Sequence, residues 1–367
     1  MSPAVPAATP TRLGPDERDA VRAAMTRVLA DGPWIGGPEV AGFEEEFAAY
    51  LGFGTAVGCA SGTDALVLAL LALGVGPGSR VLVSPHDGGY GAVATRLAGG
   101  EPVPMDLDPV ALAPTPAQAE ASADGQPVAA IVVTHLHGDP VETEGLRAWA
   151  TARGAALVED CAQAHGCRPG GVHVGATADA AAFSFYPTKN LGAVGDGGAV
   201  VFGDPDAAAR ARRLAVYGWG EGDRIDEPRG RNSRLDPMQA AILRARLPYL
   251  DARNRDRRAV LDRYRDAAPG LRLLGDPASG VAHHAVARSP RRDALVAFLR
   301  DAGVGTGVHY RHLVTAMPGL GIPATALPVA EALVAEVVSL PCTPELTADE
   351  VARTVDALAR WQEEERG

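Results

Sequence analysis

Phe183-Ser-Phe-Tyr-Pro-Thr-Lys189-Asn-Leu-Gly-Ala-Val-Gly-Asp-Gly-Gly198 joins two apolar runs, and its Lys189 is the only lysine among the 367 residues of the chain. A guanidinium cannot do what an amine can, which is to lose its proton near neutral pH and attack a carbonyl carbon. Lys189 is therefore a candidate for a lysine that forms a Schiff base. A surface lysine retained by chance is the alternative, and this stretch alone leaves both open.

The segment upstream, Ala155-Ala-Leu-Val-Glu-Asp160-Cys-Ala-Gln163-Ala-His165-Gly166, predicts a buried strand with carboxylates at its carboxyl end. Ligands bind at that end of the strands in an open α/β sheet. A buried carboxylate needs a cationic partner, and the protonated pyridine nitrogen of pyridoxal 5'-phosphate (PLP) would serve. A helix N-cap at Asp160 is the plainer alternative.

A third segment, Cys59-Ala-Ser61-Gly62-Thr63-Asp64, precedes an apolar helical run. Free backbone N–H groups and the helix dipole at such a turn favour a phosphate group. Thr63 or Asp64 could equally act as a helix cap. A phosphate seat, an acid at a strand end and a lone lysine, in this order, are far more specific together than any one alone.

With these segments the chain resembles the DegT/DnrJ/EryC1/StrS family of PLP-dependent sugar aminotransferases, of fold type I. The resemblance runs nearly from end to end. Besides the three segments above, the matching motifs are Gly36-Gly-Pro-Glu-Val40, Phe43-Glu44, Asn232-Ser-Arg-Leu-Asp236, Gln239-Ala-Ala241, Val308-His-Tyr310 and Ser339-Leu-Pro-Cys342.

The resemblance implies a role for each matching residue. Lys189 would bind the cofactor covalently and move the proton of the reaction, and Asp160 would pair with the pyridine nitrogen. The residues expected beside the ring are Gln163 and His165, and those expected around the phosphate are Gly62, Thr63 and Ser184, with Asn232 reaching the phosphate of a neighbouring subunit. The residues expected to contact substrate are Arg234, His309, Tyr310 and Tyr217; the last lies in Val216-Tyr-Gly-Trp219, which resembles members acting on 3-keto sugars.

One segment departs from the family pattern. Family members usually carry an aromatic residue that stacks on the cofactor ring, in the segment equivalent to His86-Asp-Gly88-Gly-Tyr90. The alignment places Gly88 at that position. Tyr90, two residues further on, is the candidate that could supply the ring instead.

The implied activity is the transfer of an amino group from an amino acid, by resemblance L-glutamate, to a keto sugar nucleotide. A dTDP-3-keto-6-deoxyhexose is the substrate expected, in amino-sugar or antibiotic biosynthesis, and a homodimer with shared active sites is expected. A keto-cyclitol of the scyllo-inosose type is an alternative acceptor. A non-catalytic sensor or structural homologue is another alternative. Sugar dehydratases of this family carry histidine in place of the lysine, so Lys189 argues against that activity.

Charge, apolar runs, and the spacing of cysteines and histidines argue against several other kinds of protein. The formal net charge of −11 argues against nucleic acid as a partner. The longest apolar run, residues 65–75, is too short to span a membrane. The four cysteines have no zinc or redox spacing, and a cytoplasmic protein with reduced thiols is expected. His135 and His137 are only two ligands of the three or four that a metal site requires, so no metal is expected.

Short apolar runs alternate with helical stretches between residues 55 and 201, which predicts an α/β fold with a mostly parallel sheet. The expected strands are 80–84, 128–134, 155–158, 180–185, 199–202, 282–287 and 304–308. The expected helices are 16–30, 39–51, 205–216, 237–268 with a bend at Pro248, 291–302, 328–337 and 347–364. The expected domains are a mobile segment 1–11, a large PLP-binding domain 12–248 and a smaller C-terminal α+β domain 249–367.

Overall fold

A computed structural model describes residues 4–366 and contains a seven-stranded central sheet. The strand order is β1-β7-β6-β5-β4-β2-β3, and β7 alone runs opposite to the other six. The α/β fold with a mostly parallel sheet is therefore confirmed. The strands are β1 (Thr55–Cys59), β2 (Arg80–Val83), β3 (Glu101–Pro104), β4 (Ala130–Thr134), β5 (Ala156–Asp160), β6 (Ala180–Ser184) and β7 (Gly198–Phe202).

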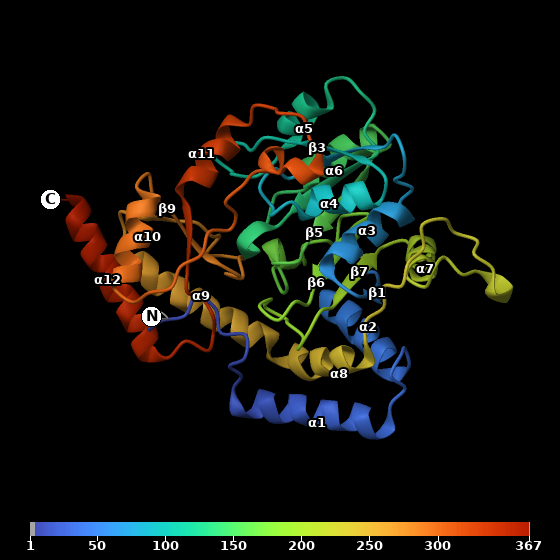
Figure 1. The fold of residues 1–367 in the computed structure, drawn as a ribbon, viewed down its shortest axis with the longest axis horizontal. Helices are drawn as coiled ribbons and strands as arrows, with labels where there is room; N and C mark the ends of the chain where they lie inside the picture. The colour runs from blue at the N-terminus through green and yellow to red at the C-terminus, as the bar shows by residue number, and fades with distance from the viewer. Residues whose placement is uncertain (1–3, 367) are drawn as a thin grey trace.

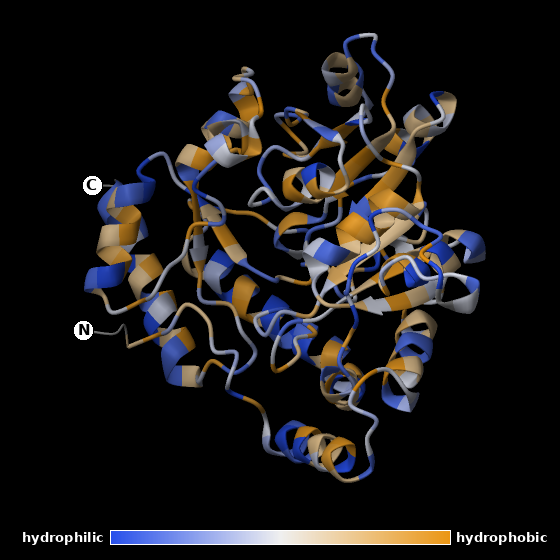
Figure 2. Cartoon of the chain, turned by 45° about the vertical axis from the view of Figure 1, so that its right-hand side comes forward, coloured by the Kyte–Doolittle hydropathy of each residue, from blue (hydrophilic) through white to orange (hydrophobic). Residues whose placement is uncertain are grey.

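Helices cover both faces of this sheet because successive strand side chains point to opposite sides. In β6, Ala180 and Ala182 join one apolar cluster, whereas Ala181 and Phe183 join another. The first face is covered by α3 (Gly62–Ala72), α4 (Tyr90–Leu97) and α7 (Pro205–Leu214). The second face is covered by α2 (Pro38–Leu51), α5 (Pro116–Ala123), α6 (Glu144–Ala152) and α8 (Pro237–Arg246). Figure 2 shows the central strands as a largely hydrophobic layer.

The C-terminal domain is built on a smaller antiparallel sheet, in the order β10-β9-β8. Its core lies between this sheet and helices α9, α10 and α12, as the predicted α+β architecture requires. Its elements are α9 (Leu250–Ala267), β8 (Arg272–Leu273), β9 (Ala285–Arg288), α10 (Arg292–Asp301), α11 (Pro328–Glu336), β10 (Val337–Leu340) and α12 (Ala348–Arg366).

Two successive helices connect the domains. Figure 1 shows α8 below the central sheet and α9 continuing toward the C-terminal domain. A short 3₁₀ turn at Leu247–Tyr249 separates them, so the break predicted at Pro248 is confirmed. The proposed domain boundary at 248/249 falls in this turn and remains a proposal. Helix α1 (Pro15–Asp31) lies beside α8.

Two of the expected segments differ in the structure. Residues 304–308 do not form a strand, because Val304 and Gly307 make only isolated bridges, to Val5 and to Ser339. The segment expected to be mobile, 1–11, is docked where it is described: Val5 is fully buried in the C-terminal core and exchanges backbone hydrogen bonds with Gly303 and Gly305. Residues 1–3 lie outside the described residues.

Candidate active site

A pocket of about 410 Å³ opens at the carboxyl ends of the parallel strands, where ligands bind in such sheets. The loops after β1, β2, β5 and β6 and two segments of the C-terminal domain line it. Nine of the residues predicted for the site lie in this pocket: Gly62, Thr63, Tyr90, Asp160, Gln163, Ser184, Lys189, His309 and Tyr310.

Lys189 lies in the loop between β6 and β7, half-buried in the pocket. Backbone hydrogen bonds fix this loop: the Lys189 N–H donates to the Tyr186 carbonyl at 2.8 Å, and the Ala193 N–H donates to the Phe185 carbonyl at 2.7 Å. Burial lowers the pKa of the Lys189 amine to about 8, and the charge of Asp160 opposes this shift. About a tenth of the amine is therefore unprotonated at pH 7, far more than for an ordinary lysine, and this fraction can act as a nucleophile or base.

Asp160 ends β5 and is 3% exposed. Its carboxylate accepts one backbone hydrogen bond, from the Ala162 N–H at 3.0 Å, and a turn rather than a helix follows it. Burial raises its pKa, and Lys189 acts in the opposite direction. The helix-cap alternative is therefore wrong, and a buried carboxylate faces a pocket that could hold a cationic ring nitrogen.

The N-terminus of α3 approaches the end of β6 closely. A Cβ atom at Gly62 would lie 2.5 Å from the Ser184 Cβ, so only glycine fits there. The Ser61 hydroxyl accepts from the Asp64 N–H at 3.1 Å, whereas the N–H groups of Gly62 and Thr63 belong to the first helical turn, which lacks intrahelical partners. Backbone donors and the Ser184 hydroxyl thus surround a seat for a phosphate group.

Two tyrosines occupy the place where Gly88 departs from the family pattern. A Cβ at Gly88, whose φ is 80°, would lie 2.8 Å from the Tyr90 ring and 3.1 Å from the Tyr310 ring. No side chain fits at position 88, because these rings already fill the space. Gln163 holds the second ring in place: its Nε2 donates to the Tyr310 hydroxyl at 3.0 Å and its Oε1 accepts from the His137 N–H at 2.7 Å.

Four predicted residues lie outside the pocket. His165 is fully buried behind it, against Phe183 and Phe185, and neither ring nitrogen has a hydrogen-bond partner among residues 4–366. The other three belong to the segment that follows α7: Asn232 and Tyr217 are exposed and Arg234 is half-buried. Within one chain, the structure does not bring these three residues to Lys189.

The pocket also contains residues that the sequence did not single out. Among them, His283 and His284 precede β9, and the His284 ring stacks on His309 with ring centroids 4.0 Å apart. The adjacent histidines in Val281-Ala-His-His-Ala were the available signal, but nothing local places them beside a lysine 94 positions earlier. The others are Ser61, Leu66, Ala162, Tyr186, Thr188 and Asp196.

The two histidines considered as metal ligands, His135 and His137, do not belong to one group with metal-ligand spacing. His135 is buried with both ring nitrogens engaged: Nδ1 accepts from the Val141 N–H at 3.0 Å, and Nε2 lies 2.8 Å from Glu159 Oε2. Within residues 4–366, His135, Glu159 and Cys161 form one group with metal-ligand spacing. Because both His135 nitrogens already have hydrogen-bond partners, we interpret this group as structural: it links Glu159 of β5 to the segment that follows β4.

These residues fit PLP: the carboxylate for a pyridine nitrogen, the amine for the aldehyde carbon, the α3 N-terminus for the phosphate, and two tyrosine rings beside the cavity.

A family model described as the DegT/DnrJ/EryC1/StrS aminotransferase family matches residues 15–359.

The chain belongs to this family.

Curated relatives support the same assignment. The chain is 42% identical over 358 residues to dTDP-3-amino-3,4,6-trideoxy-alpha-D-glucose transaminase of Streptomyces venezuelae, covering 93% of this chain and 92% of the relative. It is 44% identical to the erythromycin biosynthesis sensory transduction protein EryC1 of Saccharopolyspora erythraea, covering 93% and 95%.

Two solved structures extend the comparison to the cofactor. S. venezuelae DesV, solved in complex with a ketimine intermediate, has a TM-score of 0.92 at 40% identity and covers 99% of both chains. Bacillus subtilis NtdA, solved with bound cofactor PMP, has a TM-score of 0.87 at 26% identity and covers 96% of this chain and 83% of its own. The chain is a PLP-dependent sugar aminotransferase of this family.

Beyond the pocket, a second cavity of about 370 Å³ lies behind His86 and His137, between the central sheet and the C-terminal domain. No helix within residues 4–366 has the length and apolar character needed to cross a bilayer.

Proposed function

We propose that the chain transfers an amino group from L-glutamate to the 3-keto group of a dTDP-linked 6-deoxyhexose, using the residue roles set out above. The observation that carries the proposal is the shared pocket of Lys189 and Asp160, in a chain so similar to a dTDP-amino-sugar transaminase. The four cysteines are buried and free, which suits a reducing compartment such as the cytoplasm.

Each side chain performs a limited task. Bound PLP supplies the electron sink for the carbon that loses its proton. Lys189 Nζ takes and returns that proton, since its lowered pKa leaves it unprotonated for part of the time. Asp160 holds a proton on the pyridine nitrogen, and the N–H groups of Gly62 and Thr63 hold the phosphate.

We also propose a homodimer with shared sites. The exposed apolar side chains include those of three segments: Trp34 and Ile35 before α2, Tyr186 and Val194 in the Lys189 loop, and Tyr217, Trp219 and Ile225 after α7. Tyr186 is 52% exposed and also lines the pocket, so the exposed apolar part of the Lys189 loop adjoins the pocket. A second copy that covers it could bring Asn232, Arg234 and Tyr217 to its partner's site.

The test is a reaction of PLP-loaded protein with L-glutamate and a dTDP-3-keto-6-deoxyhexose, followed by mass spectrometry of the sugar nucleotide. The expected product carries an amine in place of the keto oxygen, and omission of glutamate should prevent it. Lys189→Arg is the matched control, because it keeps a cation without an amine that can form the imine. Amination of scyllo-inosose without any reaction of the sugar nucleotide would favour the cyclitol alternative, and no reaction of either would favour the sensor alternative.

A further inference from the structure

Two buried asparagines link the Lys189 loop to helix α9. Asn190, next to Lys189, is 1% exposed, and Asn254 in α9 is 2% exposed. Asn190 Nδ2 donates to the Val281 carbonyl at 3.1 Å and to Asn254 Oδ1 at 2.8 Å. Asn254 Nδ2 donates to the His165 carbonyl at 2.8 Å.

These contacts fix both amide orientations. A backbone carbonyl can only accept, so the atom that faces Val281 must be the Asn190 nitrogen, and the atom that faces the His165 carbonyl must be the Asn254 nitrogen. The two assignments are independent and agree, because they also place an Asn190 donor against an Asn254 acceptor. The Asn190 oxygen must therefore point the other way.

That oxygen determines the tautomer of His283. His283 Nδ1 lies 2.9 Å from Asn190 Oδ1, which can only accept. Nδ1 therefore carries the proton, and in the neutral ring Nε2 carries a lone pair. Burial and the neighbouring His284, Lys189 and Arg257 hold the pKa of His283 well below its usual range, so the ring stays neutral.

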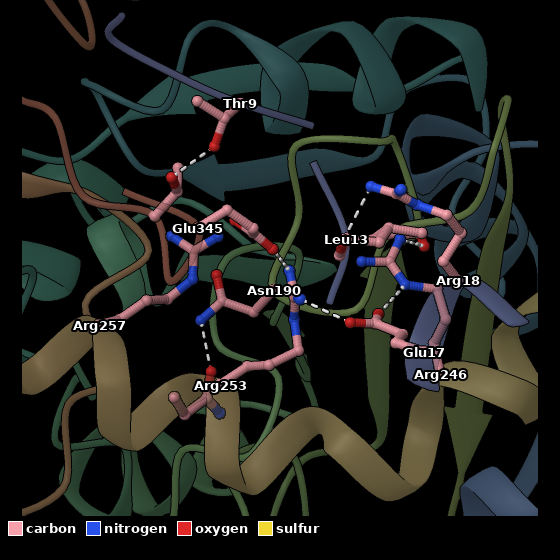
Figure 3. A network of polar contacts seen from close by, with 12 residues as sticks. Thr9, Leu13, Glu17, Arg18, Asn190, Arg246, Arg253, Arg257 and Glu345 are labelled. Atoms are coloured by element: carbon pink, nitrogen blue, oxygen red, sulfur yellow. Dashed lines mark hydrogen bonds and ion pairs between the residues drawn. The ribbon is translucent and has the colours of Figure 1, made fainter. Parts of the chain in front are cut away.

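The backbone of His283 is also held in position. Arg257 in α9 is 3% exposed and donates from Nη1 to the His283 carbonyl at 3.2 Å. His283 lines the same pocket as Lys189. Asn190, the residue that orients His283, is itself buried and is labelled in the polar network of Figure 3 together with Arg257.

We propose that His283 Nε2 accepts a hydrogen bond from the Lys189 amine whenever that amine is free of the cofactor, with Asn190 and Asn254 as positioning residues. This contact would orient the Lys189 lone pair and stabilise its protonated form after it has taken up the reaction proton. The inference rests on the proposed function, because it concerns the same lysine.

Two substitutions separate this role from a structural one. His283→Asn keeps a donor where Nδ1 was, so the bond to Asn190 survives, but it removes Nε2, the proposed acceptor for Lys189. His283→Gln places an amide oxygen near the former Nε2 position and gives up the bond to Asn190. If the role of His283 is purely structural, asparagine should be the better replacement. If His283 is a hydrogen-bond acceptor in the pocket, glutamine should be the better replacement.

The readout is the titration of Lys189 in protein loaded with pyridoxamine 5'-phosphate, in which the lysine amine is free. Competitive acetylation across a pH series, with mass spectrometry of the peptide, reports on this one amine because the chain has a single lysine. Loss of an acceptor destabilises the ammonium form, so His283→Asn should lower the midpoint by about one pH unit. His283→Gln should lie close to wild type.

Equal midpoints in the three proteins, or a larger shift in His283→Gln than in His283→Asn, would overturn the proposal. Acetylation needs no turnover, so a failed sugar assay does not affect this result. Should the variants not fold, histidine-selective ¹⁵N labelling of the wild-type holoprotein gives a second test, since all histidine tautomers are visible there. A His283 ring protonated at Nε2 would contradict the proposal, and one protonated at Nδ1 supports it.

Discussion

At the scale of single residues, the Lys189 amine is the group whose charge should control the rate. Burial lowers its pKa to about 8, so the amine gains a proton as the pH falls below that value and can then no longer take one from the substrate. We expect the single-turnover rate of the amino-loaded enzyme with its keto sugar to fall about tenfold per pH unit on the acid side. A rate that stays constant between pH 6 and pH 8 would contradict this role.

The second prediction at this scale concerns Asp160. Asp160→Asn keeps the size of the side chain but cannot hold a proton on a pyridine nitrogen, so turnover should fall about 10²- to 10³-fold. Cofactor content, measured by absorbance after gel filtration, should change little, because the phosphate seat at Gly62 and Thr63 is untouched. Near wild-type turnover in this variant would reject the assignment.

Much of the site could be predicted at the residue scale because its motifs are continuous in sequence. Lys189, Asp160 and Gly62 each lie in a short segment whose chemistry is local, and the sheet brings the three segments together. His283 and His284 could not be found this way, since their approach depends on how the C-terminal domain docks. His165 was predicted from its motif as a pocket residue, but its ring is buried outside the pocket, against Phe183 and Phe185.

At the scale of elements, strands with a continuous apolar sequence could be predicted, whereas the edge strand β3 could not. The predicted strands at 80–84, 128–134 and 180–185 match β2, β4 and β6 closely. Strand β3, Glu-Pro-Val-Pro, carries two prolines and so has no ordinary strand signal. It is tolerated because it lies at the edge of the sheet, where a missing N–H donor is harmless.

Helix α1 is tied to the Lys189 loop by a buried ion pair, which gives a prediction at this scale. Glu17 is 4% exposed and accepts from Arg246 Nε and from Arg253 Nη1, each at 2.7 Å (Figure 3). Arg246 also donates to the Gly192 carbonyl in that loop. Glu17→Ala leaves a buried guanidinium unpaired and should lower the free energy of unfolding by about 3 kcal/mol in denaturant titration.

The matched control is the exposed pair Arg291–Glu365. Glu365→Ala should lower the free energy of unfolding by less than about 1 kcal/mol, because water screens that pair. Equal effects of the two substitutions would show that the Glu17 pair does not hold α1 in place.

At the scale of the whole molecule, the proposed dimer predicts complementation between two inactive chains. A hybrid of a Lys189→Ala chain with an Asn232→Ala chain would contain one site with both native residues and one with neither. Mixing the variants should therefore restore part of the activity under conditions where subunit exchange is shown independently. Full activity of a strictly monomeric form would refute the shared site and leave Asn232 as part of a surface loop.

The central claim is that Lys189 binds PLP covalently in the pocket at the strand ends. Borohydride reduction of the PLP-loaded protein, followed by peptide mapping, tests it most directly, because reduction makes the bond to the lysine permanent. The predicted result is one pyridoxyl group per chain, on the peptide that contains Lys189, and none in Lys189→Arg. A label at the N-terminal amine alone, or no label in protein that has been freshly loaded with PLP, would contradict the account.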